Sequence, residues 1–265
     1  MRVALGLSYN GQAYNGWQSQ PDGNTVQDRL EAALREFTAT RVGTLCAGRT
    51  DAGVHGLMQV VHFDTEVQRR EYAWLRGLNA LLPSDIGVQW ARAVPDEFHC
   101  RASAKTRRYA YVLLESPVRP SVEAGRVGWV FRPLDAAAMR QASTHLLGEH
   151  DFSSFRAAAC QALSPVKTLM RIDIQRKGRD AHSAYWRFEF EANAFLHHMI
   201  RNLMGCLLQV GQGLRPPEWM AEVLAARSRD AAAPTFSPNG LYFLGPTYDA
   251  HWGLPQEVPA YDWLP

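Results

Sequence analysis

Two spacings of apolar side chains alternate along the first 95 residues of this chain, and their order restricts the fold. Residues 3–9 are apolar at every second position, as in a half-buried strand, whereas residues 26–37 are apolar at helical spacing behind Thr25, a residue suited to an N-cap. The next segments, with strand, strand, helix and strand spacing, are residues 42–47, 57–64, 74–82 and 86–90. The resulting order, strand-helix-strand-strand-helix-strand, is that of the ferredoxin-like arrangement.

The second half of the chain repeats this order of elements without repeating the sequence. Its segments are a strand at 109–113, a helix at 135–147, strands at 170–174 and 186–190, helices starting near Ala194 and Pro216, and a closing strand at 241–244. We therefore predict an α+β fold of two ferredoxin-like, or RRM-like, halves. Their antiparallel sheets are expected to join into one extended sheet, with helices on one face and the active-site cleft at the junction.

The same pattern predicts where the chain divides. Residues 1–95 are expected to form the N-terminal half, and residues 107–250 the C-terminal half. Residues 96–106 lack periodicity and are expected to link the two halves. The tail, residues 251–265, is rich in Trp, Tyr and Pro and has no motif that suggests a role.

Composition excludes several classes of protein. A chain of 265 residues with 46% hydrophobic and 20% charged side chains can bury a globular core. Its N-terminus lacks the apolar run of a signal peptide and no stretch of about 18 apolar residues occurs, so we expect a cytoplasmic protein. The four cysteines lie far apart without a CxxC pair, which favours free thiols and argues against zinc. The formal net charge of +2 is compatible with an anionic partner but does not by itself indicate one.

The strongest candidate for chemistry is the glycine-rich loop from Ala47 to Gly56, which holds Asp51 two residues after Arg49. An aspartate in a turn more often caps or closes that turn than reacts. A free aspartate is nevertheless ionised at neutral pH and can act as a nucleophile or a base. The loop lacks the Lys and Ser/Thr of a phosphate-binding P-loop, so binding of a nucleoside triphosphate is disfavoured.

At this loop the sequence resembles a known family. The stretch GRTDAGVHG closely resembles the catalytic-aspartate loop of the TruA-type tRNA pseudouridine synthases. Further resemblances follow in the order expected for that family: YNGQAYNGWQSQP, NALLPSDI, FHCRASAKTRRYAYVLL, GEHDFSSFR, EANAFLHHMIRNLMG and NGLYFLG. Together the matching segments run from about residue 3 to residue 248, so they cover nearly the whole chain.

This resemblance implies an isomerase that breaks the N1–C1′ bond of a uridine in tRNA, turns the base and rejoins it through C5. The family's essential aspartate corresponds to Asp51 and the arginine of the same loop to Arg49, which is then expected to contact the carboxylate and help fill the space of the flipped base. The tyrosine of the RRY motif corresponds to Tyr109 and is expected to lie against the target base. The implied substrates are uridines on the 3′ side of the anticodon stem and loop, and the implied active form is a homodimer.

The implied reaction needs neither a cofactor nor a metal, because isomerisation involves no redox change and no external group. The sequence has no dinucleotide fingerprint, Walker motif or metal-ligand spacing, which agrees with that expectation. The residue types also suit the task, since an arginine and an aromatic ring can replace and hold a nucleotide that leaves its stem.

Several further residues are candidates for RNA contact, each with an ordinary structural alternative: Arg107, Arg108, Asn193, His197, His198, Arg201 and Leu241. Arg107 and Arg108 could equally belong to an edge strand with solvated arginines. Phe195 and Leu241 resemble family positions near the active site, but either could equally be packing.

The pair His197 and His198 is interpreted through a helix expected to start near Ala194. Adjacent helical positions diverge by about a hundred degrees, so the two imidazoles would not chelate one metal together. Arg201 follows His197 by four positions and would share its helical face, where it could contact phosphate or remain solvated.

Two other functions stay open at this stage. One is a non-catalytic RNA-binding or RNA-folding module that uses the same cleft. The other is a nucleosidase-like enzyme that excises uracil, because both reactions begin at the same bond; free uracil and a fall in strand mass would favour it. The sequence also does not choose whether Asp51 attacks C1′ or C6 or removes a sugar proton, nor whether Tyr109 stacks or transfers a proton.

Overall fold

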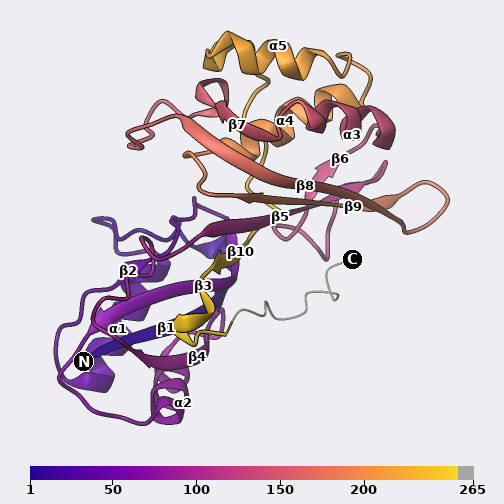
Figure 1. Cartoon of the computed structure of the whole chain (residues 1–265). Coiled ribbons are helices and arrows are strands. Elements are labelled where there is room, and N and C mark those ends of the chain that lie inside the picture. The colour runs from indigo at the N-terminus through magenta and orange to yellow at the C-terminus, as the bar shows by residue number, and fades with distance from the viewer. Residues whose placement is uncertain (256–265) are drawn as a thin grey trace. The chain divides into compact units, whose positions relative to one another are not determined.

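The chain forms two compact units, which the computed structural model describes over residues 1–255 (Figure 1). The first unit contains Met1–Arg107 together with the chain from Tyr242 to residue 255. The second unit is Arg108–Leu241. The predicted tail begins at residue 251, and its residues 256–265 lie outside the described residues.

The first unit has the order of elements that the apolar spacing predicts. Its elements are β1 (Arg2–Tyr9), α1 (Val26–Thr38), β2 (Leu45–Cys46), β3 (His55–Asp64), α2 (Glu71–Leu81), β4 (Ile86–Val94) and, from Tyr242 onward, β10 (Leu241–Thr247). The strands lie in the order β4-β1-β3, and both β2 and β10 pair with β3. β1 is antiparallel to β3 and to β4.

Helix α1 begins and ends for local reasons. The Thr25 side chain accepts a hydrogen bond from the Asp28 N–H at 3.2 Å and so satisfies one free donor of the first turn. The helix ends at Thr38 because Ala39 adopts the left-handed conformation with φ 55°.

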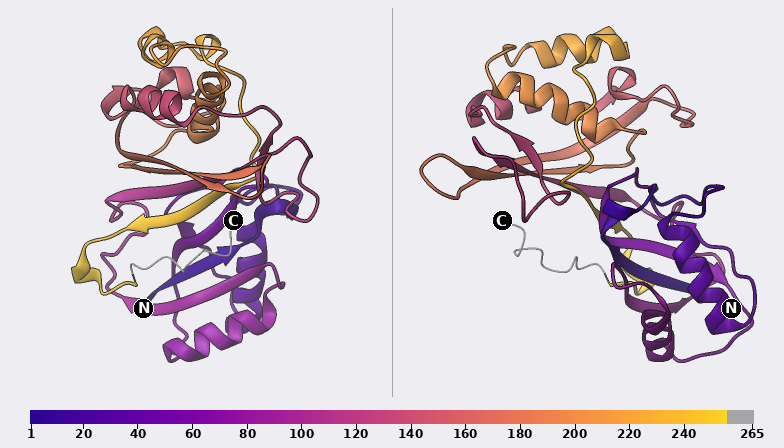
Figure 2. Two further views of the ribbon diagram at one scale, coloured as in Figure 1. Left: turned by 90° about the vertical axis from the view of Figure 1, so that its right-hand side faces the viewer. Right: turned by 180° about the vertical axis from the view of Figure 1, so that it is seen from behind.

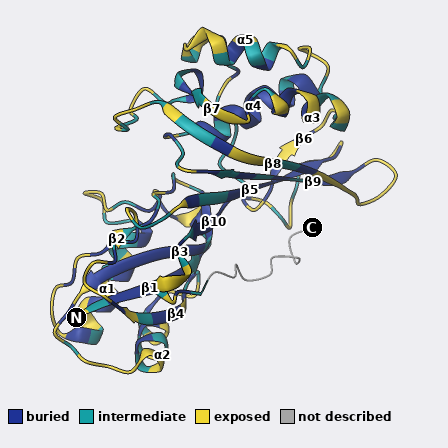
Figure 3. Cartoon of the chain, viewed as in Figure 1, coloured by how far each residue is buried: buried dark blue, intermediate teal, exposed yellow. Residues whose placement is uncertain are grey.

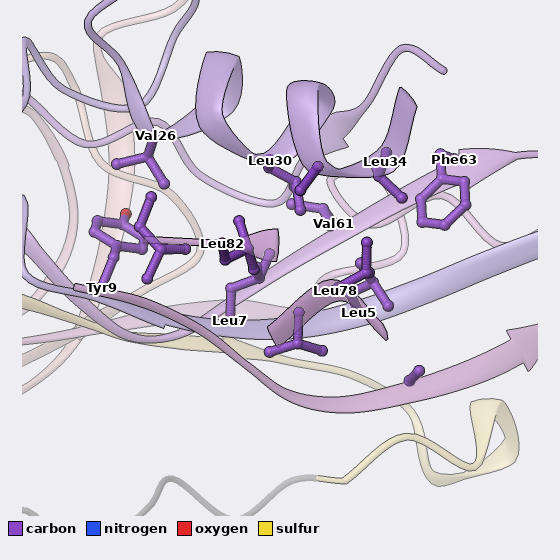
Figure 4. Close-up of a cluster of buried hydrophobic side chains, with 14 of the residues drawn as sticks. Leu5, Leu7, Tyr9, Val26, Leu30, Leu34, Val61, Phe63, Leu78 and Leu82 are labelled. Atoms are coloured by element: carbon purple, nitrogen blue, oxygen red, sulfur yellow. The ribbon is translucent and has the colours of Figure 1, made fainter. Parts of the chain in front are cut away.

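The sheet of the first unit is covered on both faces. Figure 4 shows the cluster between the sheet and its two helices, in which β1 and β3 residues such as Leu5 and Val61 meet Leu30 of α1 and Leu78 of α2. A second cluster on the other face contains Met58, Val60, Trp90, Phe98, Cys100, Tyr248 and Leu254. Because both faces are covered, β3 is buried along most of its length, as Figure 3 shows. The predicted linker therefore packs on the sheet through Phe98 and Cys100.

Among the described residues, the second unit contains five strands and three helices. Its elements are β5 (Thr106–Glu115), which begins in the first unit, β6 (Gly128–Val130), α3 (Ala136–Thr144), β7 (Gly148–Asp151), β8 (Val166–Gly178), β9 (Ala184–Ala192), α4 (Met199–Gly211) and α5 (Trp219–Ala226). The strand order is β5-β9-β8-β7, with the short β6 added parallel to β5. Figure 2 shows α3, α4 and α5 on the same side of these strands. The predicted α+β class is confirmed.

Several predicted segments differ in length from the observed elements; the strand predicted at 170–174, for example, is β8, Val166–Gly178. The strand predicted at 42–47 is only Leu45–Cys46, because the Thr44 N–H donates to Glu31 Oε1 of α1 at 2.8 Å rather than to a strand. The helix predicted at 135–147 is Ala136–Thr144. The helix predicted from Ala194 begins only at Met199, because His198 has φ 61°, a left-handed conformation that cannot lie inside a right-handed helix.

The expected purely antiparallel pairing is wrong at two places. β6 is parallel to β5, and β10 is parallel to β3 through Tyr242 opposite His55 and Phe243 opposite Gly56. Chain order alone had grouped this last strand with the second half, whereas its pairing attaches it to β3 in the first unit. Within residues 1–255, every helix is too short or too polar to cross a bilayer.

Candidate active site

Asp51 lies in the loop between β2 and β3, at the start of a tight turn. The Val54 N–H donates to the Asp51 carbonyl at 3.1 Å, and Gly53 has φ 79°, which a turn of this shape requires at its third position. The Asp51 residue is half-buried, whereas Arg49 is exposed. The turn therefore explains the second glycine of the loop.

The loop is anchored by the segment that follows β1. The Trp17 N–H donates to the Thr50 carbonyl at 3.0 Å, and the Gly53 N–H donates to the Tyr14 carbonyl at 3.3 Å. The buried Tyr9 hydroxyl is 2.8 Å from Thr50 Oγ1. Burial raises the pKa of Tyr9, so this hydroxyl stays protonated at neutral pH. The main chain around Asp51 is thus fixed from one side.

A second set of contacts holds the base of the loop. The Ala47 N–H donates to the Val60 carbonyl at 2.8 Å, and the side-chain amide of Gln59 pairs with both main-chain groups of Gly48. Arg107 Nη2 lies 3.4 Å from the Ala47 carbonyl and 2.6 Å from the Arg101 carbonyl. Arg107, a candidate for RNA contact, therefore also ties the 95–105 segment to this loop.

These anchoring residues were not singled out in the sequence as part of a site. The sequence indicates only that Tyr9 and Gln59 belong to strands and that Tyr14 and Trp17 lie in a polar loop. A buried glutamine inside an apolar strand is the one signal that could have been noticed, because such a group needs hydrogen-bond partners.

In the second unit, Tyr109 of β5 is buried, and its ring meets the ring of Phe195 edge to face, with 5.1 Å between centroids. Such a contact limits the orientations open to the tyrosine ring. The preceding residue, Arg108, is half-buried, and its Nε has no hydrogen-bond partner among the described residues.

The prediction places His197 and His198 at adjacent positions of a helix, but in the structure both residues precede α4. Their rings lie 4.0 Å apart between centroids, so the expected divergence of the two imidazoles is wrong. The reason is again the left-handed His198, which turns the chain before the helix starts. His197 is exposed, and its N–H donates to Cys160 Sγ at 3.4 Å.

The remaining candidates make contacts within the second unit. Arg201 Nε donates to the Phe236 carbonyl at 2.8 Å, and Asn193 Oδ1 accepts from the Thr168 N–H at 3.1 Å. Leu241 is buried. These contacts give Arg201 and Asn193 a structural role, whatever else they bind.

One group of side chains in the first unit has the composition of a metal site. The possible ligand atoms of His62, His99 and Cys100 lie within 4.8 Å of one another. The Nδ1 atoms of both histidines, however, accept main-chain N–H groups, from Cys100 at 3.3 Å and from Arg101 at 3.2 Å. A metal-binding histidine instead donates its second ring N–H to an acceptor, so we assign no metal to this group.

Comparisons with known proteins give matches along the full length of the chain. A family model described as tRNA pseudouridine synthase matches residues 7–101 and 142–249. The chain is 73% identical over 265 residues to the tRNA pseudouridine synthase A of Polaromonas sp. strain JS666, with 100% of both chains covered. It is 71% identical over 274 residues to that of Acidovorax sp. strain JS42, again with 100% of both covered. The solved Cbf5-Nop10-Gar1 complex aligns with 91% of this chain and 48% of that chain, at 11% identity and a TM-score of 0.36.

Proposed function

Because the chain belongs to the tRNA pseudouridine synthase family, whose members are isomerases acting on tRNA, we propose that Asp51 is its catalytic carboxylate. The observation that carries the proposal is the contrast within one loop: the main chain is hydrogen-bonded at Gly48, Thr50 and Gly53, while Asp51 is only half-buried. A reacting group benefits from a fixed backbone and an accessible head, because small displacements cost large factors in rate.

The reaction breaks the N1–C1′ bond of uridine and forms a C5–C1′ bond, so substrate and product have the same mass. A uridine in a paired stem shields both positions, and the nucleotide has to leave the stack before it can react. The Asp51 carboxylate then acts on the extruded uridine, as a nucleophile or as a base.

Arg49 and Tyr109 are proposed to hold the extruded nucleotide. Arg49 is exposed beside the anchored Thr50, and its long cationic side chain suits the space that the flipped base leaves between phosphates. Tyr109 is proposed to lie against the uracil, with the Phe195 contact limiting the orientation of its ring.

For the wider RNA surface we propose Arg108 and His197 ahead of the other candidates. Arg108 is half-buried and carries a permanent positive charge, and His197 is exposed. Arg107, Asn193 and Arg201 hold main-chain groups of the protein itself, and contact with RNA is a second role for them and for His198. Leu241 is proposed as packing at the site. We further propose the anticodon stem and loop as the substrate region, a homodimer as the active form and the cytoplasm as its location.

The test is Asp51→Asn compared with Asp96→Asn, an exposed aspartate in the 95–105 segment. Asp51→Asn should bind tRNA within about twofold of wild type, because phosphate contacts dominate affinity, yet form no pseudouridine. Carbodiimide mapping of the treated tRNA measures the product, and Asp96→Asn should form it normally. Normal product with Asp51→Asn would remove the carboxylate from the reaction. Loss of strand mass with release of uracil would instead indicate excision.

A further inference from the structure

A fully buried amide lies at the base of the Asp51 loop. Gln59 of β3 has 0% of its surface exposed. Its Oε1 accepts the Gly48 N–H at 3.3 Å, and its Nε2 donates to the Gly48 carbonyl. One side chain therefore satisfies both main-chain groups of a single residue in the loop.

The position of this contact continues the pairing of β2 with β3. Leu45 lies opposite His62 and Cys46 opposite Val61, and the next rung is the hydrogen bond from the Ala47 N–H to the Val60 carbonyl. The following rung would bring Gly48 opposite Gln59, where the loop leaves the sheet. Here Gly48 pairs with the side chain of Gln59 and not with its main chain. The register of β2 and β3 is therefore kept although their two backbones move apart.

Glutamine suits this position chemically. Its amide offers a donor and an acceptor at one end of the side chain, which matches the N–H and carbonyl of a peptide. An ionised glutamate offers only acceptors, and a methionine of similar size offers neither. Buried main-chain groups that lose their partners are costly, so loss of the amide would favour movement of the Gly48 peptide toward water.

We propose that Gln59 is a positioning residue for Asp51 that acts through the Gly48 peptide; the inference rests on the proposed catalytic role of Asp51. Gly48 lies three residues before Asp51, and Thr50 between them is held by Trp17 and Tyr9. The Tyr9 hydroxyl that meets Thr50 is buried as well, so the loop is held at two buried points of the first unit, Gly48 and Thr50. Gln59 itself touches no reacting atom.

The first test is Gln59→Met, which keeps the volume and removes both hydrogen bonds. We expect kcat to fall by roughly tenfold to a hundredfold, as a displacement near 1 Å at a reacting group does, while the Kd for tRNA changes by less than about twofold. Amide hydrogen exchange should rise in residues 47–54 and stay unchanged in α1. The matched control is Gln89→Met, an exposed glutamine of β4 that donates to Ser8 Oγ at 2.8 Å, which should alter none of these quantities.

The second test is Gln59→Glu, which answers the question even if Gln59→Met does not fold. A protonated carboxyl group regains one donor and one acceptor, so kcat relative to wild type should recover as the pH falls from about 8 to about 6, because burial raises the pKa of a carboxyl group. A ratio that does not depend on pH, a wild-type kcat for Gln59→Met, or equal losses of kcat and tRNA affinity would overturn the inference. Asp51→Asn measured in parallel separates the two proposals: if it stays active, the catalytic assignment fails, and if it is inactive while Gln59→Met is fully active, only the inference about Gln59 fails.

Discussion

Gly16 allows the segment after β1 to approach the Asp51 loop, and replacing it with alanine should displace that loop. Gly16 has φ 91°, and an added Cβ would lie 2.6 Å from the Thr50 carbonyl oxygen and 3.0 Å from the Asp51 carbonyl carbon. Ordinary contact begins at 3.4 Å, so the Thr50 oxygen and the new methyl group have to separate by about 0.8 Å. The oxygen is part of the main chain, and the methyl group is attached directly to it, so no flexible side chain can absorb the shift.

Two costs follow for Gly16→Ala. An alanine held at positive φ lowers the free energy of unfolding by about 1–2 kcal/mol. In a chain of this size each kcal/mol lowers Tm by about 2–4 °C. The displacement of the Thr50–Asp51 peptide should lower kcat by roughly tenfold to a hundredfold. Turnover is measured as tritium release from tRNA labelled at uridine C5, because C5 loses its hydrogen when it bonds to C1′.

Gly23→Ala is the matched control. Gly23 has φ 66°, but an added Cβ would meet nothing within 4 Å, so this variant carries the backbone strain without the contact. It should lose a similar amount of stability and keep its kcat. A wild-type kcat for Gly16→Ala, or an equal loss of kcat for Gly23→Ala, would refute the idea that the close approach positions Asp51.

Three further outcomes are expected. Arg49→Ala should lower turnover by more than it weakens tRNA binding, because phosphate contacts elsewhere set affinity; filter binding beside single-turnover tritium release measures both, and unchanged turnover would remove Arg49 from the mechanism. Tyr109→Phe should keep tRNA binding in the same filter assay; retained turnover supports stacking, and lost turnover supports proton transfer. Burial lowers the pKa of His62 to about 4 from its usual 6.5, so the unfolded chain takes up this proton first and stability falls as pH drops from 6.5 toward 4. Urea unfolding at several pH values should show a smaller loss in His62→Gln, and an equal loss would mean that other groups cause the acid sensitivity.

The long elements of this fold follow from local physical chemistry and were predicted from the sequence. β1 was expected to be half-buried but is buried on both faces: its large residues meet the helices, and the small Ala4 and Gly6 leave room for the second cluster. α1 begins at Thr25 because its hydroxyl can accept an N–H of the first turn. The loop that carries Asp51 was likewise identified from its residues. Elements of two to four residues, such as β6 and β7, were missed because a period cannot be read from so few positions.

The sequence by itself determined the α+β class, the principal helices and strands and the identity of the candidate aspartate, because spacing, capping and turn residues act between near neighbours in the chain. Only the tertiary structure decided which distant residues hold that aspartate. Tyr9 and Trp17 reach the loop from the N-terminal end of the first unit's sequence, and Tyr242 pairs with His55 although most of the chain separates them. Such contacts depend on strand register and on which backbone groups lack partners, and neither quantity is encoded at a short distance along the chain.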